Sequence, residues 1–245
     1  MRAIIAAAAG AAIALAQLNL PNKDFWAANI FLQWLSVIVV ALVLFNDAAA
    51  SASSAIQAAR VREYENGLRT TMSATIAAIV KTFNVPWDEI SVYYYRARHF
   101  SRLRRITRVG GVRAGTSVAD MQISFRPSVG IAGTAFSEEV IIALEWRDFA
   151  RAATIRGPQE WRRRMPRARY GLTWGQLRRF PAEEGIIASP TFNANGKPDG
   201  CILVCSPLKL SALSSDAMRQ ILDNCAAALD RLGPPPNGWW RHHER

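Results

Sequence analysis

Apolar residues are concentrated in two runs near the start of the chain. The second run, residues 25–45, reads FWAANIFLQWLSVIVVALVLF and carries no charge. An α-helix rises about 1.5 Å per residue, so about 20 apolar residues cross the roughly 30 Å hydrocarbon core of a bilayer. The pattern therefore predicts a membrane-spanning helix over this run.

The first run, residues 3–18, begins AIIAAAAGAAIALA and is followed by a short polar segment. Three interpretations of it stay open. The run could form a first transmembrane helix in a hairpin with residues 25–45. It could instead be a cleaved signal ending at Ala14-Leu15-Ala16, or an alanine-rich helix that lies at the membrane–water interface. Residues 1–45 together form the expected membrane region.

The charges that flank these runs predict the orientation. Lys23 and Asp24 cancel in the loop between the runs, whereas arginines follow the second run from Arg60 onward. Positive charge stays on the cytoplasmic side of a membrane. Both the hairpin and the cleaved signal therefore place residues 46–245 in the cytoplasm, and we expect an inner-membrane protein.

Residues 46–82 read as a connecting amphipathic helix. Its first residues, NDAAASASS, are small and polar and predict an exit from the membrane, and a regular helix is expected over 52–82. Apolar residues then recur every three or four positions, which is the helical period. Such a stripe packs on the adjoining domain or pairs with its twin in a homodimer. The stripe consists of Val61, Tyr64, Leu68, Met72, Ile76 and Ile79.

Beyond Pro86 the pattern changes to short β-prone segments. Residues 89–96 and 102–109 predict two strands, with a turn at Gly110-Gly111. The glycine-punctuated residues 127–136 predict a further turn, and residues 137–146 are β-prone at their centre. Residues 147–169 are basic and helical or looped.

The last part of the domain contains clearer signals. Thr173 and Gln176 have the spacing of a capping box, so a short helix should begin there. Residues 186–190 and 201–207 predict a hairpin around the turn-forming NANGKPDG, and residues 214–232 predict a helix. The fold class expected is α+β, an antiparallel sheet with terminal helices on one face, preceded by the N-terminal transmembrane helix or hairpin.

Two of these segments resemble a GAF domain. PSVGIAGTAF resembles the glycine turn of that family, with Gly130 and Gly133 at its two glycine positions. EEGIIASPTFNANGKPDGCILVCSP, residues 183–207, is similar to its last hairpin, and the helix that follows resembles its closing helix. The resemblance implies a GAF-like domain over 83–232, then a basic tail over 233–245, and a sensory or regulatory role.

Net charge and cysteine content bear on the cellular compartment expected for the chain. The chain has a net charge of +11, of which residues 1–45 contribute +1 through Arg2, Lys23 and Asp24, which leaves +10 for the rest. Cys201 and Cys205 are four strand positions apart, about 13 Å, which is too far for a disulfide. Buried reduced cysteines are expected, in agreement with a cytoplasmic location.

Residues for catalysis or for a metal site are not apparent in the sequence. The three histidines, His99, His242 and His243, share no ligand spacing with the cysteines, so no metal site is expected. Nucleophile and phosphate-loop motifs are absent, and we expect no catalytic residues and no enzyme activity. No cofactor is assigned, because no cysteine outside the hairpin core and closing helix is placed to attach a chromophore.

Two arginine clusters could bind anions. One interpretation is that the clusters form a solvated face near anionic lipid. The other is that they form a surface that binds a nucleotide or a phosphate ligand. Long nucleic acid is not expected for a chain held at a membrane. The first cluster comprises Arg96, Arg98, Arg102, Arg104, Arg105, Arg108 and Arg113, and the second Arg162, Arg163, Arg164, Arg167 and Arg169, flanked by Trp161 and Tyr170.

The segment 147–180 is expected to close a pocket on the sheet face opposite the terminal helices. Trp146, Arg147, Trp174 and Arg178 are the ligand-binding candidates, chosen by position and chemistry. The function predicted is a membrane-anchored cytoplasmic sensor that binds a small ligand, anionic or a nucleotide, or an unidentified protein partner. The alternatives are a membrane-active effector whose helices perturb the bilayer and a ligand-free scaffold subunit.

Overall fold

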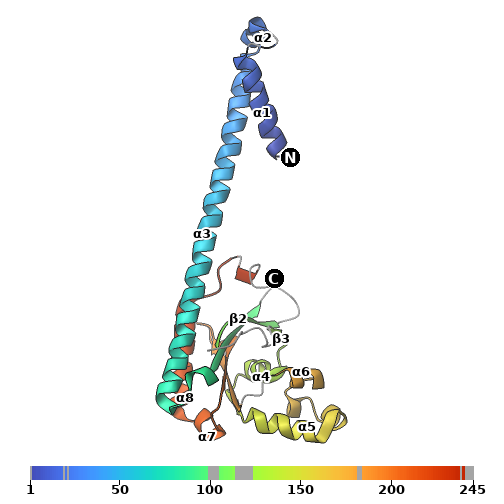
Figure 1. Ribbon diagram of the computed structural model, residues 1–245, viewed down its shortest axis with the longest axis vertical. Coiled ribbons are helices and arrows are strands. Elements are labelled where there is room, and N and C mark those ends of the chain that lie inside the picture. Colours follow the sequence, from blue (N-terminus) through green and yellow to red (C-terminus); the bar gives the residue numbers. More distant parts are fainter. Residues whose placement is uncertain are drawn as a thin grey trace. The chain divides into compact units, whose positions relative to one another are not determined.

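The computed structural model describes residues 2–18, 20, 22–98, 105–113, 124–180, 184–237 and 239–240 (Figure 1). The chain divides into two compact units. Unit 1 comprises Met1–Arg62 with Pro236–Arg245, and unit 2 comprises Glu63–Pro235. Unit 2 contains the sheet, and each unit is considered by itself.

Unit 1 is helical. It contains α1 (Arg2–Gln17), α2 (Lys23–Ala28) and the first part of α3 (Ile30–Phe83). Asn29 separates α2 from α3, and its side-chain amide donates a hydrogen bond of 2.8 Å to the Phe25 carbonyl. The apolar run is therefore interrupted once before its longer part. By length and composition, α3 is apolar enough to cross a membrane, whereas the apolar part of α1, Ala7–Gln17, is shorter.

The α3 helix is longer than the sequence pattern predicts. No break occurs at NDAAASASS, and the expected boundaries at residues 45 and 82 both fall inside α3. Alanine has the highest helix propensity, so a run of small residues continues a helix that is already formed. The side-chain hydroxyls of Ser53 and Ser54 donate hydrogen bonds to the backbone carbonyls of Ala50 and Ser51, so these polar groups are paired within the helix.

Unit 2 is built on an antiparallel sheet of six strands in the order β3-β2-β1-β6-β5-β4. The expected fold class is thereby confirmed, and the predicted hairpin is formed by β5 and β6. The short β3 was not predicted. The strands are β1 (Ser91–Arg98), β2 (Arg105–Arg113), β3 (Ser124–Phe125), β4 (Ile142–Leu144), β5 (Gly185–Phe192) and β6 (Pro198–Ser206).

Helices cover both faces of this sheet. The C-terminal part of α3 and α8 lie side by side on one face, and α4, α5 and α6 lie on the other (Figure 1). The predicted capping box at Thr173 and Gln176 is present at the start of α6. The remaining elements are η1 (Trp87–Glu89), α4 (Gly130–Glu138), α5 (Trp146–Arg163), η3 (Arg167–Arg169), α6 (Trp174–Arg179), α7 (Leu210–Leu213) and α8 (Asp216–Leu232).

The apolar stripe of α3 is buried within its own chain. Tyr64 is 7% exposed, and Leu68, Met72, Ile76 and Ile79 are 3% exposed or less. The packing interpretation of the stripe is therefore correct for these positions. A homodimer stays a prediction, and it needs a surface other than this stripe.

Two glycine assignments from the sequence are wrong. Gly110 and Gly111 do not form a turn but lie inside β2, opposite Tyr94 and Tyr93. A Cβ atom at Gly110 would collide with the side chain of Leu68, so glycine lets α3 approach the sheet closely. In the second case the turn occupies only residues 127–129, and α4 begins at Gly130.

Candidate functional site

The segment from Trp146 to Phe180 forms an aromatic layer on the sheet. Trp146 is 1% exposed, and its ring centroid lies 4.8 Å from that of Phe180 and 5.5 Å from that of Phe149. Trp161 is equally buried, and its indole N–H donates a hydrogen bond of 3.0 Å to the Leu172 carbonyl. These rings pack against the sheet residues Tyr93, Tyr95, Ile186, Ala188, Cys201 and Leu203.

The four predicted ligand-binding residues are distributed between the core and the surface. Trp146 is in the core, and Trp174 is partly buried, with its ring 6.4 Å from that of Trp161. Arg147 and Arg178 are exposed, and Arg147 forms an ion pair of 3.5 Å with Glu184. The structure therefore joins the indoles to the core cluster and directs the two arginines to solvent. Ligand binding by these residues stays a prediction.

Gly130 and Gly133 have a packing role. Gly130 has φ +74°, a region that disfavours side chains, and its N–H donates a hydrogen bond of 2.7 Å to the Tyr170 carbonyl. A Cβ atom at Gly133 would lie 2.6 Å from the Arg126 carbonyl oxygen. The two glycines thus let α4 begin close to Phe125 and to the turn at Arg126, and the hydrogen bond of Gly130 ties α4 to the segment after α5.

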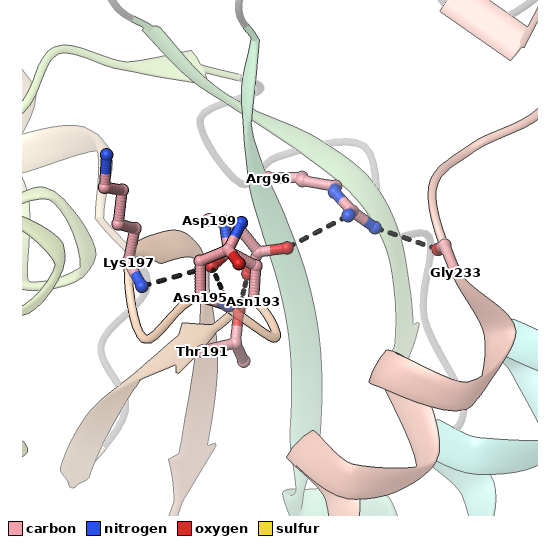
Figure 2. A network of polar contacts seen from close by, with 7 residues as sticks. All are labelled: Arg96, Thr191, Asn193, Asn195, Lys197, Asp199 and Gly233. Carbon is pink, nitrogen blue, oxygen red and sulfur yellow. Dashed lines mark hydrogen bonds and ion pairs between the residues drawn. The ribbon is translucent and has the colours of Figure 1, made fainter.

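A polar network lies on the opposite face of the sheet (Figure 2), among side chains that are mostly apolar. Arg96 on β1 forms an ion pair of 2.9 Å with Asp199 on β6, and its second terminal nitrogen donates a hydrogen bond of 2.8 Å to the Gly233 carbonyl. The hydroxyl of Thr191 donates to the other carboxylate oxygen of Asp199 at 3.0 Å. The guanidinium therefore joins the two central strands to the end of α8.

Tyr64 connects α3 to this network through a side-chain hydrogen bond with Arg96. Burial disfavours the phenolate and raises the pKa of Tyr64 to about 12, against the opposing effect of the nearby Arg96 charge. Burial also raises the pKa of Tyr94, whose hydroxyl contacts Thr191. Sequence analysis missed this network, because Arg96 was assigned to a basic cluster and Asp199 to a turn.

The two predicted arginine clusters differ in the structure. Arg96 is committed to the ion pair described above, and Arg98, Arg108 and Arg113 also have polar or electrostatic contacts. Arg102 and Arg104 lie outside the described residues, as do His99, His242 and His243. In the second cluster, Arg162, Arg163 and Arg167 are exposed, and the guanidinium of Arg164 lies 5.7 Å from the centroid of the Trp161 ring.

The cysteines are all buried and free. Burial raises the pKa of the Cys201 thiol well above its ordinary value, and the same cause raises that of Cys225. A thiol in this state is a poor nucleophile at neutral pH. Within the described ranges, no group of three histidine, cysteine or acidic side chains is placed to hold a metal ion.

Comparison with known proteins gives matches among solved structures only. No family model and no curated protein matches the chain. The type II free methionine-R-sulfoxide reductase of Thermoplasma acidophilum is 16% identical, with a TM-score of 0.42, and the match covers 69% of this chain and 93% of that one. For the free methionine-R-sulfoxide reductase of Neisseria meningitidis, solved with its substrate, the identity is 12%, the TM-score 0.41 and the coverages 74% and 89%.

A GAF domain is also among the matches. The GAF domain of the Acinetobacter phosphoenolpyruvate-protein phosphotransferase is 14% identical, with a TM-score of 0.41, and the match covers 72% of this chain and 92% of that one. The resemblance seen in the sequence is confirmed in this sense: unit 2 has a GAF-like fold. At such identities and TM-scores the matches concern the fold and carry no argument about ligand or activity.

The reductases among the matches correct one expectation. We expected no enzyme activity because the sequence lacks nucleophile and phosphate-loop motifs. Several of the similar structures are nevertheless enzymes, so this fold also occurs in catalysts. The absence of a familiar motif therefore does not exclude catalysis, and the expectation is wrong as an exclusion.

Proposed function

We propose that the chain is a membrane-anchored sensory or regulatory module. In this proposal the apolar part of α3 crosses the inner membrane, and unit 2 lies in the cytoplasm and binds a small ligand or a protein partner. The observation that carries the anchor is a set of large apolar side chains that the chain itself does not cover. Phe31 is 70% exposed, Trp34 64% and Phe45 76%.

The length and charge of this segment support a bilayer as its surroundings. No charged residue occurs between Asp24 and Asp47. The helical part from Ile30 to the first charge is about 25 Å long, which is short for a bilayer but compatible with local thinning. Removing such side chains from water is favourable by about 25 cal/mol per Å² of apolar surface. The arginines on α3 that follow support the cytoplasmic side for unit 2.

Membrane extraction of an arginine variant tests the anchor. Ile38 and Leu42 are exposed, so Ile38→Arg and Leu42→Arg together leave the packing of unit 2 intact. Each arginine near the middle of a span costs about 2.5–3.5 kcal/mol on insertion scales. We expect the wild type to stay in the pellet after alkaline carbonate washing and the double variant to be released.

The matched control is Ile56→Arg, which changes an exposed residue of the same helix beyond the apolar run. We expect this variant to remain in the pellet. Release of the wild type by carbonate, or release of the control together with the double variant, would contradict the anchor. Strong activity of alkaline phosphatase fused after residue 240 would contradict the cytoplasmic side.

A further inference from the structure

The exposed side of α5, α6 and the residues between them is rich in arginine. Seven arginines and no acidic residue lie between Glu160 and Glu183. Two exposed arginines are paired with acids of the same chain, Arg163 with Glu160 at 3.0 Å and Arg167 with Glu138 at 3.2 Å. Among the described residues, the others form no ion pair. We call the exposed set the arginine surface: Arg151, Arg156, Arg162, Arg163, Arg167, Arg178 and Arg179.

Two apolar side chains in the same segment are highly exposed. Ile155 is 78% exposed and Met165 is 77% exposed, which makes them the most exposed large apolar residues in the described part of the chain. The other exposed apolar residues of unit 2, such as Trp87 at 43% and Val140 at 47%, are much better covered. A dense run of positive charge and the least covered apolar groups of unit 2 therefore occur in the same segment.

This combination favours a protein over the other anionic partners. Base stacking needs exposed aromatic rings, whereas Trp161 is buried and Trp174 partly buried. Anionic lipid would attract the arginines by charge alone and would not need the exposed apolar pair. A helix that inserts into the lipid surface presents a continuous apolar face, whereas Ile155 is the one large apolar residue that α5 exposes. Arginine and methionine are enriched in protein interfaces, and the guanidinium fork binds carboxylates in a bidentate manner.

We infer that the arginine surface is a docking site for an acidic protein segment that also carries apolar residues. Its carboxylates bind the guanidiniums, and its apolar side chains cover Ile155 and Met165. This inference rests on the proposed function, because it names the class of protein partner that the module binds. The charge provides long-range attraction, and the apolar pair distinguishes this partner from other polyanions.

The test uses two synthetic peptides and the full chain in lipid nanodiscs. Both peptides have 20 residues and the same number of glutamates. One carries leucines at every third or fourth position, and the other carries alanines in their place. We expect the leucine peptide to bind about tenfold more tightly in fluorescence anisotropy, since each buried leucine contributes on the scale of hydrophobic transfer.

Two sets of variants assign the binding to this surface. Ile155→Ser with Met165→Ser should remove the advantage of the leucine peptide and leave the alanine peptide unchanged. Arg162→Ser, Arg178→Ser and Arg179→Ser together should weaken both peptides by about tenfold or more. The matched control, Arg105→Ser, Arg219→Ser and Arg231→Ser, removes the same charge from exposed positions elsewhere in unit 2 and should change the affinity for neither peptide by more than about twofold.

Several results would overturn the inference. These are equal affinity for the two peptides, an equal loss in the control triple variant, or tighter binding of single-stranded RNA or of vesicles with 30% phosphatidylserine. The substituted side chains are exposed, and an unchanged melting temperature of each variant verifies folding. Carbonate extraction of the membranes from which the chain is purified separates the two proposals, since a chain that stays anchored but binds no peptide contradicts only the docking site.

Discussion

The two faces of the sheet in unit 2 are covered in different ways. The face under α3 and α8 is packed by regular helices with aliphatic side chains, and it contains one polar network around Arg96. The face under α4, α5 and α6 is covered by the short regular helix α4 and by an irregular segment rich in packed aromatic rings. The comparison shows that one sheet can be covered by long helices with regular apolar stripes on one side, and by one short helix with a layer of large aromatic rings on the other.

The largest effect on stability is expected from Trp146→Ala, on the face under α4, α5 and α6, called the aromatic face. The substitution removes a fully buried indole that packs against Phe149 and Phe180. Loss of a large aromatic side chain from a core costs about 3–5 kcal/mol. We expect a decrease of that size in the free energy of unfolding, measured by urea denaturation. Trp87→Ala is the control, because the Trp87 side chain is 43% exposed and its loss should cost far less stability. Equal losses for the two variants would contradict a larger contribution of the aromatic layer to stability.

The polar network lies on the face under α3 and α8, called the helix face, and its loss should lower stability by nearly as much. Arg96→Met leaves the Asp199 carboxylate without its partner, although side-chain exposures of 19% and 11% allow some hydration. We expect a loss of about 2–3 kcal/mol, below the 3–5 kcal/mol typical of a fully buried pair. Adding Asp199→Leu to Arg96→Met should recover part of this loss. A double variant less stable than the single one would contradict a simple ion-pair role.

Alkaline pH should weaken the helix face through Tyr64, while the other buried tyrosines whose pKa is raised by burial, Tyr94 and Tyr95, add to the loss of stability on both faces. The pKa of Tyr64 is about 12 in the folded state and near 10 when unfolded, so the folded state holds this proton more tightly. The stabilisation is complete below pH 10 and is lost as the pH rises from 10 to 12. A shift of this size corresponds to about 2–3 kcal/mol. In Tyr64→Phe the free energy of unfolding should fall less steeply between pH 10 and pH 12 than in the wild type. An equally steep fall would show that other groups cause the loss of stability.

The smallest effect concerns the contact between α3 and β2. Gly110→Ala would place a methyl group against the flexible ends of Leu68 and Met72. Overpacking of this kind costs about 1–3 kcal/mol, and we expect a value near the lower end because both side chains can move. Gly175→Ala is the control, since a Cβ atom there meets nothing within 4 Å. A neutral result at Gly110 would show that α3 packs less closely than described.

The helix face could be predicted from the sequence because its signals are local. The stripe of α3, the α8 pattern and the NANGKPDG turn each lie within one segment. The helix and the turn were interpreted correctly, whereas the stripe was left open between packing and homodimer pairing, and the structure shows the packing. Gly110-Gly111 was misread because the reason for glycine there is a helix about forty positions earlier in the chain. The network of Arg96 and Asp199 was missed for the same reason, since strand pairing and not spacing brings these residues together.

The aromatic face was predicted less well. Trp146 and Trp174 were chosen as walls of a pocket because they lie in a segment able to cover the sheet. That segment does cover it, but the ring of Trp146 packs on Phe180, and no periodicity in the sequence indicates this contact. Position along the chain thus identified the covering segment, whereas the direction of each side chain depended on contacts that only the fold specifies.

The pairing of β1 with β6 determines when unit 2 can fold during synthesis. Ser91 pairs with Cys205, and Arg96 reaches the Gly233 carbonyl, 137 residues further along the chain. Ribosomes add about 5–20 residues per second, so the centre of the sheet forms roughly 10 s after β1 emerges. By then the apolar part of α3 has long left the ribosome. A nascent chain stalled before β6 would therefore carry its proposed anchor together with an unpaired edge of β1.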